Sequence, residues 1–237
     1  MQHRLAAFIL ALGLLPTGAL AECRQALALG LDVSGSVDLR EYRLQIDGLI
    51  AALDDPDVVR LLLSTPTAPV SVLVYEWSGA EDHAVIVPWT SINGLQELSE
   101  IRATLAQAER RVTTPGTALG EAMKRGVAHL SDQDHCWKET LDISGDGKSN
   151  LGPRPRDVKD ASDNKGITLN ALVVAPAAPV SEGTGANSDE LSSYFRAEVI
   201  FGPGAFVETA FGYEDYAAAM TRKLKRELEG RVIGAVQ

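Results

Sequence analysis

Apolar residues follow two different spacings along the chain, and the order of these spacings predicts an α/β domain. Short, almost continuous apolar runs are typical of strands buried on both faces of a sheet. Four such runs lie at residues 25–31, 70–77, 140–144 and 167–174. Apolar residues at helical spacing occupy residues 39–53, 95–108, 119–130 and 213–228. Because strands and helices alternate, we expect a doubly wound, mainly parallel sheet with helices on both faces.

One strand is predicted to run against the others. Residues 84–89 follow the strand at 70–77 after a connection that is short enough for an antiparallel pair. This pair would place one antiparallel strand at an edge of the sheet.

Four segments are less regular. Residues 58–63 fit either one helical turn or a short apolar segment, and residues 155–165 fit a short helix. Residues 175–187, rich in Ala, Pro and Gly, are predicted to form a surface loop. Residues 198–207 contain Gly-Pro-Gly, which indicates a broken strand or a hairpin.

The first 21 residues are predicted to be a secretory signal rather than part of the fold. They combine a weakly positive start, an uncharged apolar run at 5–15 and a small-x-small cleavage site at 19–21. The apolar run is too short to cross a bilayer comfortably, and no later stretch reads as a membrane helix. We therefore expect an exported protein with one domain over residues 22–237.

Composition limits the class of function. Hydrophobic residues make up 45% of the 237 residues, which is enough for a full core. The formal net charge of −10 argues against a nucleic-acid partner, because binding one requires positive groups that neutralise its phosphates. The simplest meaning of this charge is solubility.

Oxygen-bearing side chains stand in three separated segments that could meet in space. They are Asp32, Ser34, Ser36, Thr117 and Asp146. The first three follow the strand at 25–31, Thr117 begins a predicted helix, and Asp146 follows the strand at 140–144. Loops at the carboxyl ends of parallel strands line one edge of a sheet. Carboxylates and hydroxyls at that edge predict a divalent-cation site, which suits Mg²⁺ best.

This arrangement resembles the metal-ion-dependent adhesion site of the von Willebrand factor A superfamily. The family pattern is Asp-x-Ser-x-Ser, a distant Thr and a distant Asp, and the five residues match it in order and rough spacing. The resemblance implies that they hold Mg²⁺, or another divalent cation such as Mn²⁺ or Ca²⁺. It also implies one coordination position left open for an Asp or Glu of a partner protein.

The order of elements over residues 26–228 resembles this superfamily as well, and the Gly-Pro-Gly-Ala-Phe-Val segment at Gly202–Val207 resembles an exported bacterial branch of it. The resemblance implies a periplasmic or secreted, adhesion-type protein-binding module, and not an enzyme. Gly145 departs from the family pattern, since many relatives carry Thr directly before the second Asp.

Two other functions stay open. A metal-assisted hydrolase or phosphatase would use Asp32 as nucleophile, although Ser34 stands where such phosphatases usually carry a second Asp. The sequence also contains neither a Gly-x-Ser-x-Gly elbow nor a Lys-bearing phosphate loop. A scaffold domain would have an empty site and a surface that scaffolds an assembly. Separately, Ser36 and Thr117 could simply cap helices.

The two cysteines, Cys23 and Cys136, are predicted to form one disulfide, as a pair usually does in an exported protein. Cys23 lies nine residues before Asp32, and Cys136 lies ten before Asp146. If the two strands are parallel neighbours, both cysteines fall at the opposite edge and at nearly equal depth, within bonding range.

Two charged features have expected structural roles. Asp142 lies within a buried strand and needs a partner, for which Lys138, Arg125 or a backbone group is available. The basic stretch 222–226 on the last helix is expected to form a solvated face.

Overall fold

The computed structural model describes residues 22–176 and 186–229. The predicted secretory signal, residues 1–21, lies outside them, and so does most of the loop expected over 175–187. Within the described ranges, no helix combines the length and the apolar character needed to cross a membrane.

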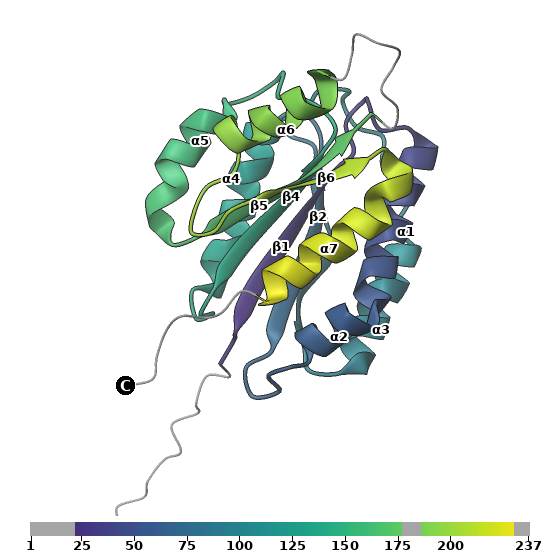
Figure 1. The fold of residues 1–237 in the computed structure, drawn as a ribbon, viewed down its shortest axis with the longest axis vertical. Coiled ribbons are helices and arrows are strands. Elements are labelled where there is room, and N and C mark those ends of the chain that lie inside the picture. The colour runs from purple at the N-terminus through teal and green to yellow at the C-terminus, as the bar shows by residue number, and fades with distance from the viewer. Residues whose placement is uncertain (1–21, 177–185, 230–237) are drawn as a thin grey trace, which may run out of the picture.

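Six strands form one sheet in the order β3-β2-β1-β4-β5-β6 (Figure 1). They are β1 Gln25–Asp32, β2 Val70–Trp77, β3 His83–Ile92, β4 Glu139–Gly145, β5 Thr168–Ala175 and β6 Val207–Phe211. Neighbouring strands run parallel, except that β3 pairs antiparallel with β2 at one edge. The predicted doubly wound, mainly parallel sheet with one antiparallel edge strand is therefore confirmed.

Helices cover both faces of the sheet. They are α1 Leu39–Asp54, α2 Pro56–Leu62, α3 Leu95–Ala106, α4 Leu119–Leu130, α5 Pro155–Ser162, α6 Ala186–Glu198 and α7 Tyr216–Glu229. Helices α1, α2, α3 and α7 lie on one face, and α4, α5 and α6 lie on the other (Figure 1). Three short 3₁₀ segments adjoin α4, α5 and α7: η1 Ser131–Gln133, η2 Asp163–Lys165 and η3 Tyr213–Asp215.

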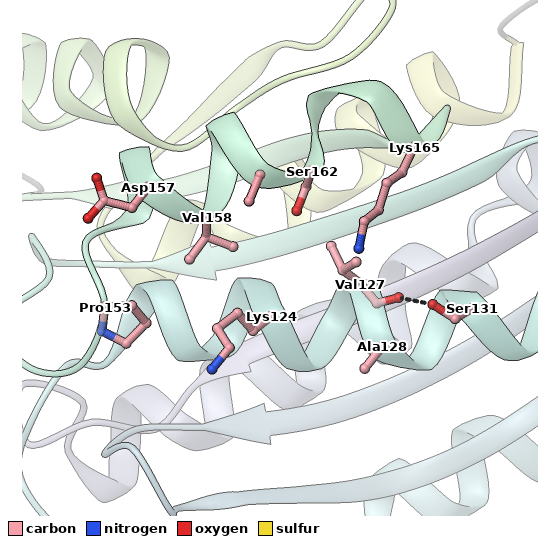
Figure 2. Close-up of a pocket in the computed structure, with 10 residues that line it drawn as sticks. Lys124, Val127, Ala128, Ser131, Pro153, Asp157, Val158, Ser162 and Lys165 are labelled. Atoms are coloured by element: carbon pink, nitrogen blue, oxygen red, sulfur yellow. Dashed lines mark hydrogen bonds between the residues drawn. The ribbon is translucent and has the colours of Figure 1, made fainter.

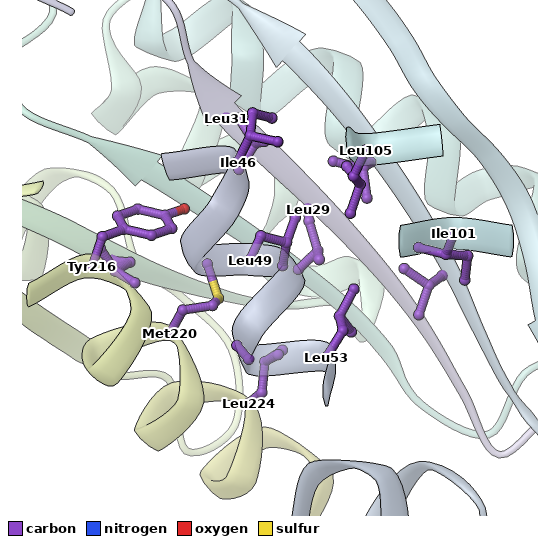
Figure 3. Packing of buried hydrophobic residues seen from close by; sticks show 14 of the residues in the cluster. Leu29, Leu31, Ile46, Leu49, Leu53, Ile101, Leu105, Tyr216, Met220 and Leu224 are labelled. Atoms are coloured by element: carbon purple, nitrogen blue, oxygen red, sulfur yellow. The ribbon is translucent and has the colours of Figure 1, made fainter. Parts of the chain in front are cut away.

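The core is divided into two clusters by the sheet. Successive side chains of a strand point to opposite faces, so Leu29 and Leu31 of β1 pack toward α1 and α7, whereas Ala28 packs toward α4. Figure 3 shows the cluster on the α1 and α7 side of the sheet, in which Leu49 of α1 and Met220 of α7 pack over β1. Because both faces of the central strands are covered, the strands read as continuous apolar runs.

Local sequence signals fix where α1 and α2 begin. Asp38 caps α1, its carboxylate accepting the Glu41 N–H while the Glu41 carboxylate accepts the Asp38 N–H, both at 2.8 Å. Asp55 caps α2, and Pro56 occupies its first turn. Of the two interpretations of residues 58–63, the helical one holds for most of the segment.

The expected broken strand or hairpin at 198–207 is wrong. Helix α6 ends at Glu198, Phe201 makes a single bridge to Leu169, and the last strand begins only at Val207. Gly202 has a φ of 88°, and a Cβ there would lie 2.3 Å from the Ile167 carbonyl oxygen. The Gly-Pro-Gly segment is therefore a tight turn against the start of β5, which only glycine allows.

The expected partners of Asp142 are also wrong. Its carboxylate lies 2.5 Å from the ammonium of Lys223, which in turn lies 2.6 Å from Glu227. All three side chains are buried between the sheet and α7. The basic stretch 222–226 is thus not uniformly solvated, because Lys223 points inward from it.

Candidate metal centre

The predicted ligand residues come from loops at one edge of the sheet. Asp32 is the last residue of β1, and Asp146 directly follows β4, which pairs parallel with β1. Ser34 and Ser36 lie between β1 and α1, and Thr117 lies just before α4. Parallel neighbouring strands carry their carboxyl ends to the same edge, which brings the two acidic residues together.

A chain of hydrogen bonds joins four of the five residues. The Asp32 Oδ1 atom accepts the Ser34 N–H at 2.8 Å, and the Ser34 and Ser36 hydroxyl oxygens lie 3.2 Å apart. The Ser36 hydroxyl donates to Asp146 Oδ1 at 2.6 Å. Residues separated by more than a hundred positions in sequence therefore converge on one small volume.

The loop that carries Thr117 is bonded to both neighbouring segments. Gly35 N–H donates to the Pro115 carbonyl at 3.2 Å, and Thr117 N–H donates to the Asn150 side-chain carbonyl at 2.9 Å. A Cβ on Gly35 would lie only 2.7 Å from the Pro115 Cβ, so this contact requires a glycine. Thr117 itself is 6% exposed.

The hydroxyls of Ser36 and Thr117 do not cap helices. Asp38 caps α1 with its own carboxylate, two residues beyond Ser36. The residue before α4 is Ala118, and no side chain caps that helix. The capping interpretation of Ser36 and Thr117 is therefore wrong.

The electrostatics of the edge favour a cation. Asp32 is fully buried, and its Oδ2 atom has no hydrogen-bond partner among the described residues. Burial, and then the nearby Asp146 carboxylate, raise the pKa of Asp32 to about 7. Burial also raises the pKa of Asp146, against hydrogen bonds from Ser36 and Tyr213. A buried and a half-buried carboxylate that repel each other, with serine hydroxyls beside them, fit a hard divalent cation.

Further residues that the sequence did not indicate hold this edge in place. Gln45 on α1 donates to the Asp32 carbonyl at 3.0 Å, and Arg110 donates to the Ser34 carbonyl at 3.1 Å. The Tyr213 hydroxyl donates to Asp146 Oδ2 at 3.3 Å. A glutamine on the buried face of a helix was the one available signal, since a buried amide needs partners.

Gly145 leaves space beside the unpartnered carboxylate oxygen. A Cβ at this position would lie 3.6 Å from Asp32 Oδ2 and 3.2 Å from the Phe195 ring. The departure from the family pattern thus falls next to the site itself. Any side chain placed here would have to fit between Asp32 and Phe195.

The disulfide lies at the other end of the same pair of strands. Cys23 and Cys136 are bonded, with their Cα atoms 4.4 Å apart, and they form a parallel bridge just before β1 and β4. The separation of 113 residues equals that of the paired residues Ala26 and Glu139, so the register does not shift. His135 lies beside the two sulfur atoms, but both sulfurs are used in the disulfide and cannot bind a metal there.

One family profile matches nearly the whole chain. The family described as "Protein of unknown function (DUF1194)" matches residues 22–232. No curated protein matches the sequence.

Solved structures share the fold. Proximal thread matrix protein 1 from the mussel byssus, with a zinc-occupied MIDAS motif, has a TM-score of 0.60 and 13% identity, over 88% of this chain and 46% of that one. The pilus adhesin SpaC from Lactobacillus rhamnosus GG, in its open conformation, has a TM-score of 0.62 and 13% identity, over 87% and 30%. A von Willebrand factor type A protein from Catenulispora acidiphila has a TM-score of 0.58 and 12% identity, over 87% and 43%.

The chain spans less than half the length of each of these structures. At such low identity the likeness shows the fold alone, and that fold is the von Willebrand factor A domain. The match over residues 22–232 shows that the chain belongs to the DUF1194 family, and its fold is that of a von Willebrand factor A domain.

Proposed function

We propose that this protein is an exported, metal-dependent protein-binding module. Asp32, Ser34, Ser36, Thr117 and Asp146 would hold one divalent cation, with Mg²⁺ as the first choice. An Asp or Glu of a partner protein would complete its coordination. The observation that carries the proposal is the fully buried Asp32, whose Oδ2 atom has no hydrogen-bond partner among the described residues and which lies near the half-buried Asp146 carboxylate.

The donor set explains why a partner carboxylate would be attracted. Two carboxylates nearly neutralise a dication, whereas neutral hydroxyls leave it able to bind one more anionic oxygen. A site with four carboxylates would repel that oxygen. Mn²⁺ or Ca²⁺ could replace Mg²⁺ at such oxygens, and the zinc-occupied motif of the mussel protein supports a divalent metal in this fold.

Exposed apolar side chains around the site support a protein as the partner. Leu39 begins α1 with 66% of its surface exposed, and Val112, 98% exposed, lies in the loop that Arg110 fixes to the Ser34 carbonyl. Leu151, 48% exposed, packs where a Cβ on Gly116 would lie. Exposed apolar residues gathered near a charged centre are typical of protein interfaces.

The hydrolase alternative has less support. It requires Asp32 to attack a substrate, and Asp32 is fully buried beside the turn that carries Ser34 and Ser36, the serine turn. The scaffold alternative requires only that no metal binds, so a metal titration distinguishes it from the other two.

Export is supported by the covalent structure. The Cys23–Cys136 disulfide is stable in an oxidising compartment, such as the periplasm or the cell exterior. A pilus adhesin, SpaC, shares the fold, which is consistent with export.

Calorimetric titration of the oxidised protein with MgCl₂ tests the proposal. We expect one saturable site in the parent and no measurable binding in Asp32→Ala, whose circular dichroism should remain that of a folded protein. Asp132→Ala, an exposed acid at the opposite edge, is the matched control and should bind Mg²⁺ normally. Unchanged Mg²⁺ affinity in Asp32→Ala would remove the basis of the proposal.

Capture of partners tests the second half of the proposal. Immobilised protein is incubated with cell-envelope extract. It should retain a reproducible set of proteins in MgCl₂, and it should not retain them in EDTA. Retention by Asp32→Ala in either condition would show that binding does not use the metal.

A further inference from the structure

A second candidate site lies away from the metal centre, between α4 and α5 (Figure 2). It is a groove with a volume of about 540 Å³, which is within the usual range for small-molecule sites. No residue that lines it belongs to the metal centre.

The walls of the groove are apolar. Val127 of α4 and Val158 of α5 line opposite walls at different points along it, and each is more than nine-tenths buried. Ala128 and Ala161 continue these walls with side chains too small to fill the space between the helices. The groove can therefore cover a short aliphatic chain, whose removal from water is favourable.

Two polar groups point into the groove without a partner. Ser162 is only 4% exposed, and its hydroxyl is directed into the groove in Figure 2. No hydrogen bond of this hydroxyl exists within the described part of the chain. The ammonium of Lys165, in η2, extends over the same end of the groove toward Val127 (Figure 2). Among residues 22–176 and 186–229, no acid pairs with it.

The other polar groups of the groove are already matched. Lys124 pairs with Glu121 at 2.8 Å, and Asp157 pairs with Arg154 at 2.8 Å. The Ser131 hydroxyl donates to the Val127 carbonyl at 3.1 Å. Two donors without a partner among the described residues therefore remain at one end of the apolar groove, the Ser162 hydroxyl and the Lys165 ammonium.

We propose that this groove binds a small amphipathic carboxylate. Its aliphatic chain would lie between Val127 and Val158, and its two carboxylate oxygens would accept from Lys165 and Ser162. One hydroxyl and one ammonium match the two oxygens of a carboxylate, and a charged donor makes the stronger bond. The proposal does not depend on the metal centre.

Octanoate is the probe for this site. Titration in EDTA, so that no metal can take the carboxylate, should give saturable binding, with NMR shifts confined to α4, α5 and η2. Octanol, which has the same chain without the charge, should bind about tenfold more weakly. Lys165→Met should weaken octanoate binding by a similar factor, and Ala161→Phe should block it by filling the groove.

Lys225→Met is the matched control, because Lys225 lies on α7 and pairs with Asp55 and Asp57 on the other face of the sheet. It should bind octanoate like the parent. Absence of saturable binding, or equal affinity in the parent and Lys165→Met, would overturn the proposal. Sedimentation of the parent and of Ala161→Phe gives a further test. If the parent does not bind octanoate and Ala161→Phe changes its oligomeric state, the groove is a contact between copies of the chain and the proposal is overturned.

Discussion

At the scale of single residues, the candidate metal centre depends on how closely three loops approach one another. The contact between Gly35 and Pro115 holds the serine turn against the loop that carries Thr117. It contributes no ligand, yet it sets the distance between hydroxyls from different segments.

Gly35→Ala should therefore weaken Mg²⁺ binding without unfolding the protein. The new Cβ would lie 2.7 Å from the Pro115 Cβ, so the Thr117 loop must move away from the serine turn. We expect a loss of about tenfold in Mg²⁺ affinity, the size typical of residues that support ligands. Calorimetric titration measures it.

Gly147→Ala is the control for this prediction. Gly147 adjoins Asp146, but a Cβ there would meet no atom within 4 Å. Its Mg²⁺ affinity should equal that of the parent. Equal affinities in both glycine variants would mean that the approach of the two loops does not matter to the site.

The residues of the candidate site were predictable from sequence, but their supports were not. Asp32 and Asp146 each follow a buried strand, and this position alone places them at one edge. Arg110 donates to the Ser34 carbonyl and Tyr213 donates to the Asp146 carboxylate, and sequence spacing gives no sign of either contact. Such contacts depend on the final path of loops, which has no periodic signal.

At the scale of elements, α7 is bound to the sheet by buried charges as well as by apolar packing. Asp142 of β4 and Glu227 of α7 both contact the ammonium of Lys223. Asn170 of β5 donates to Glu227 at 2.7 Å. The group contains two acids and one base, so one negative charge is not balanced within it.

Lys223→Met should destabilise the protein strongly. It would leave two carboxylates buried without a cation, which typically costs about 3–5 kcal/mol. Chemical denaturation at pH 8 measures the change. Asp142→Asn should be much milder, because Lys223 and Glu227 then form a balanced pair.

The difference between Asp142→Asn and the parent should depend on pH. Burial is the main cause that raises the pKa of Asp142, from 3.8 to about 7, so the folded state retains a proton that the unfolded state releases. The stability that this retained proton contributes to the parent is therefore lost as pH rises from about 4 to about 7. The variant should gain stability relative to the parent between pH 5 and pH 8. A constant difference between the two curves would contradict the shift.

Elements with strong periodic patterns were predictable, and those with weak patterns were not. The central strands read as continuous apolar runs because helices cover both faces. Helix α6 was missed since Leu191 and Phe195 are isolated apolar residues in a polar segment. Strand β6 was missed because it lies at the edge, where only Ala210 is fully buried.

At the scale of the whole molecule, the disulfide and the candidate metal centre lie at opposite ends of β1 and β4. This separation predicts that the bond supports stability but not metal binding. A Cys23→Ser, Cys136→Ser double variant should lose about 4–5 kcal/mol of unfolding free energy, since the bond closes a loop of more than a hundred residues.

Denaturation in urea measures the stability of this variant, and titration below its unfolding transition measures Mg²⁺ affinity. The affinity should equal that of the oxidised parent. A large loss of Mg²⁺ binding in a variant that is still folded would show that the far edge influences the site.

The direction of the strands has a mechanical consequence. β1 begins and α7 ends at the edge that carries the disulfide, whereas a partner would dock at the opposite edge (Figure 1). A pulling force between the partner and the start of β1 would then run along the strands. It would load the hydrogen bonds between neighbouring strands in shear, all at once rather than one by one. Tension on β1 would reach the covalent bridge before it could peel that strand from β4, so the domain should carry load without unravelling from its first strand.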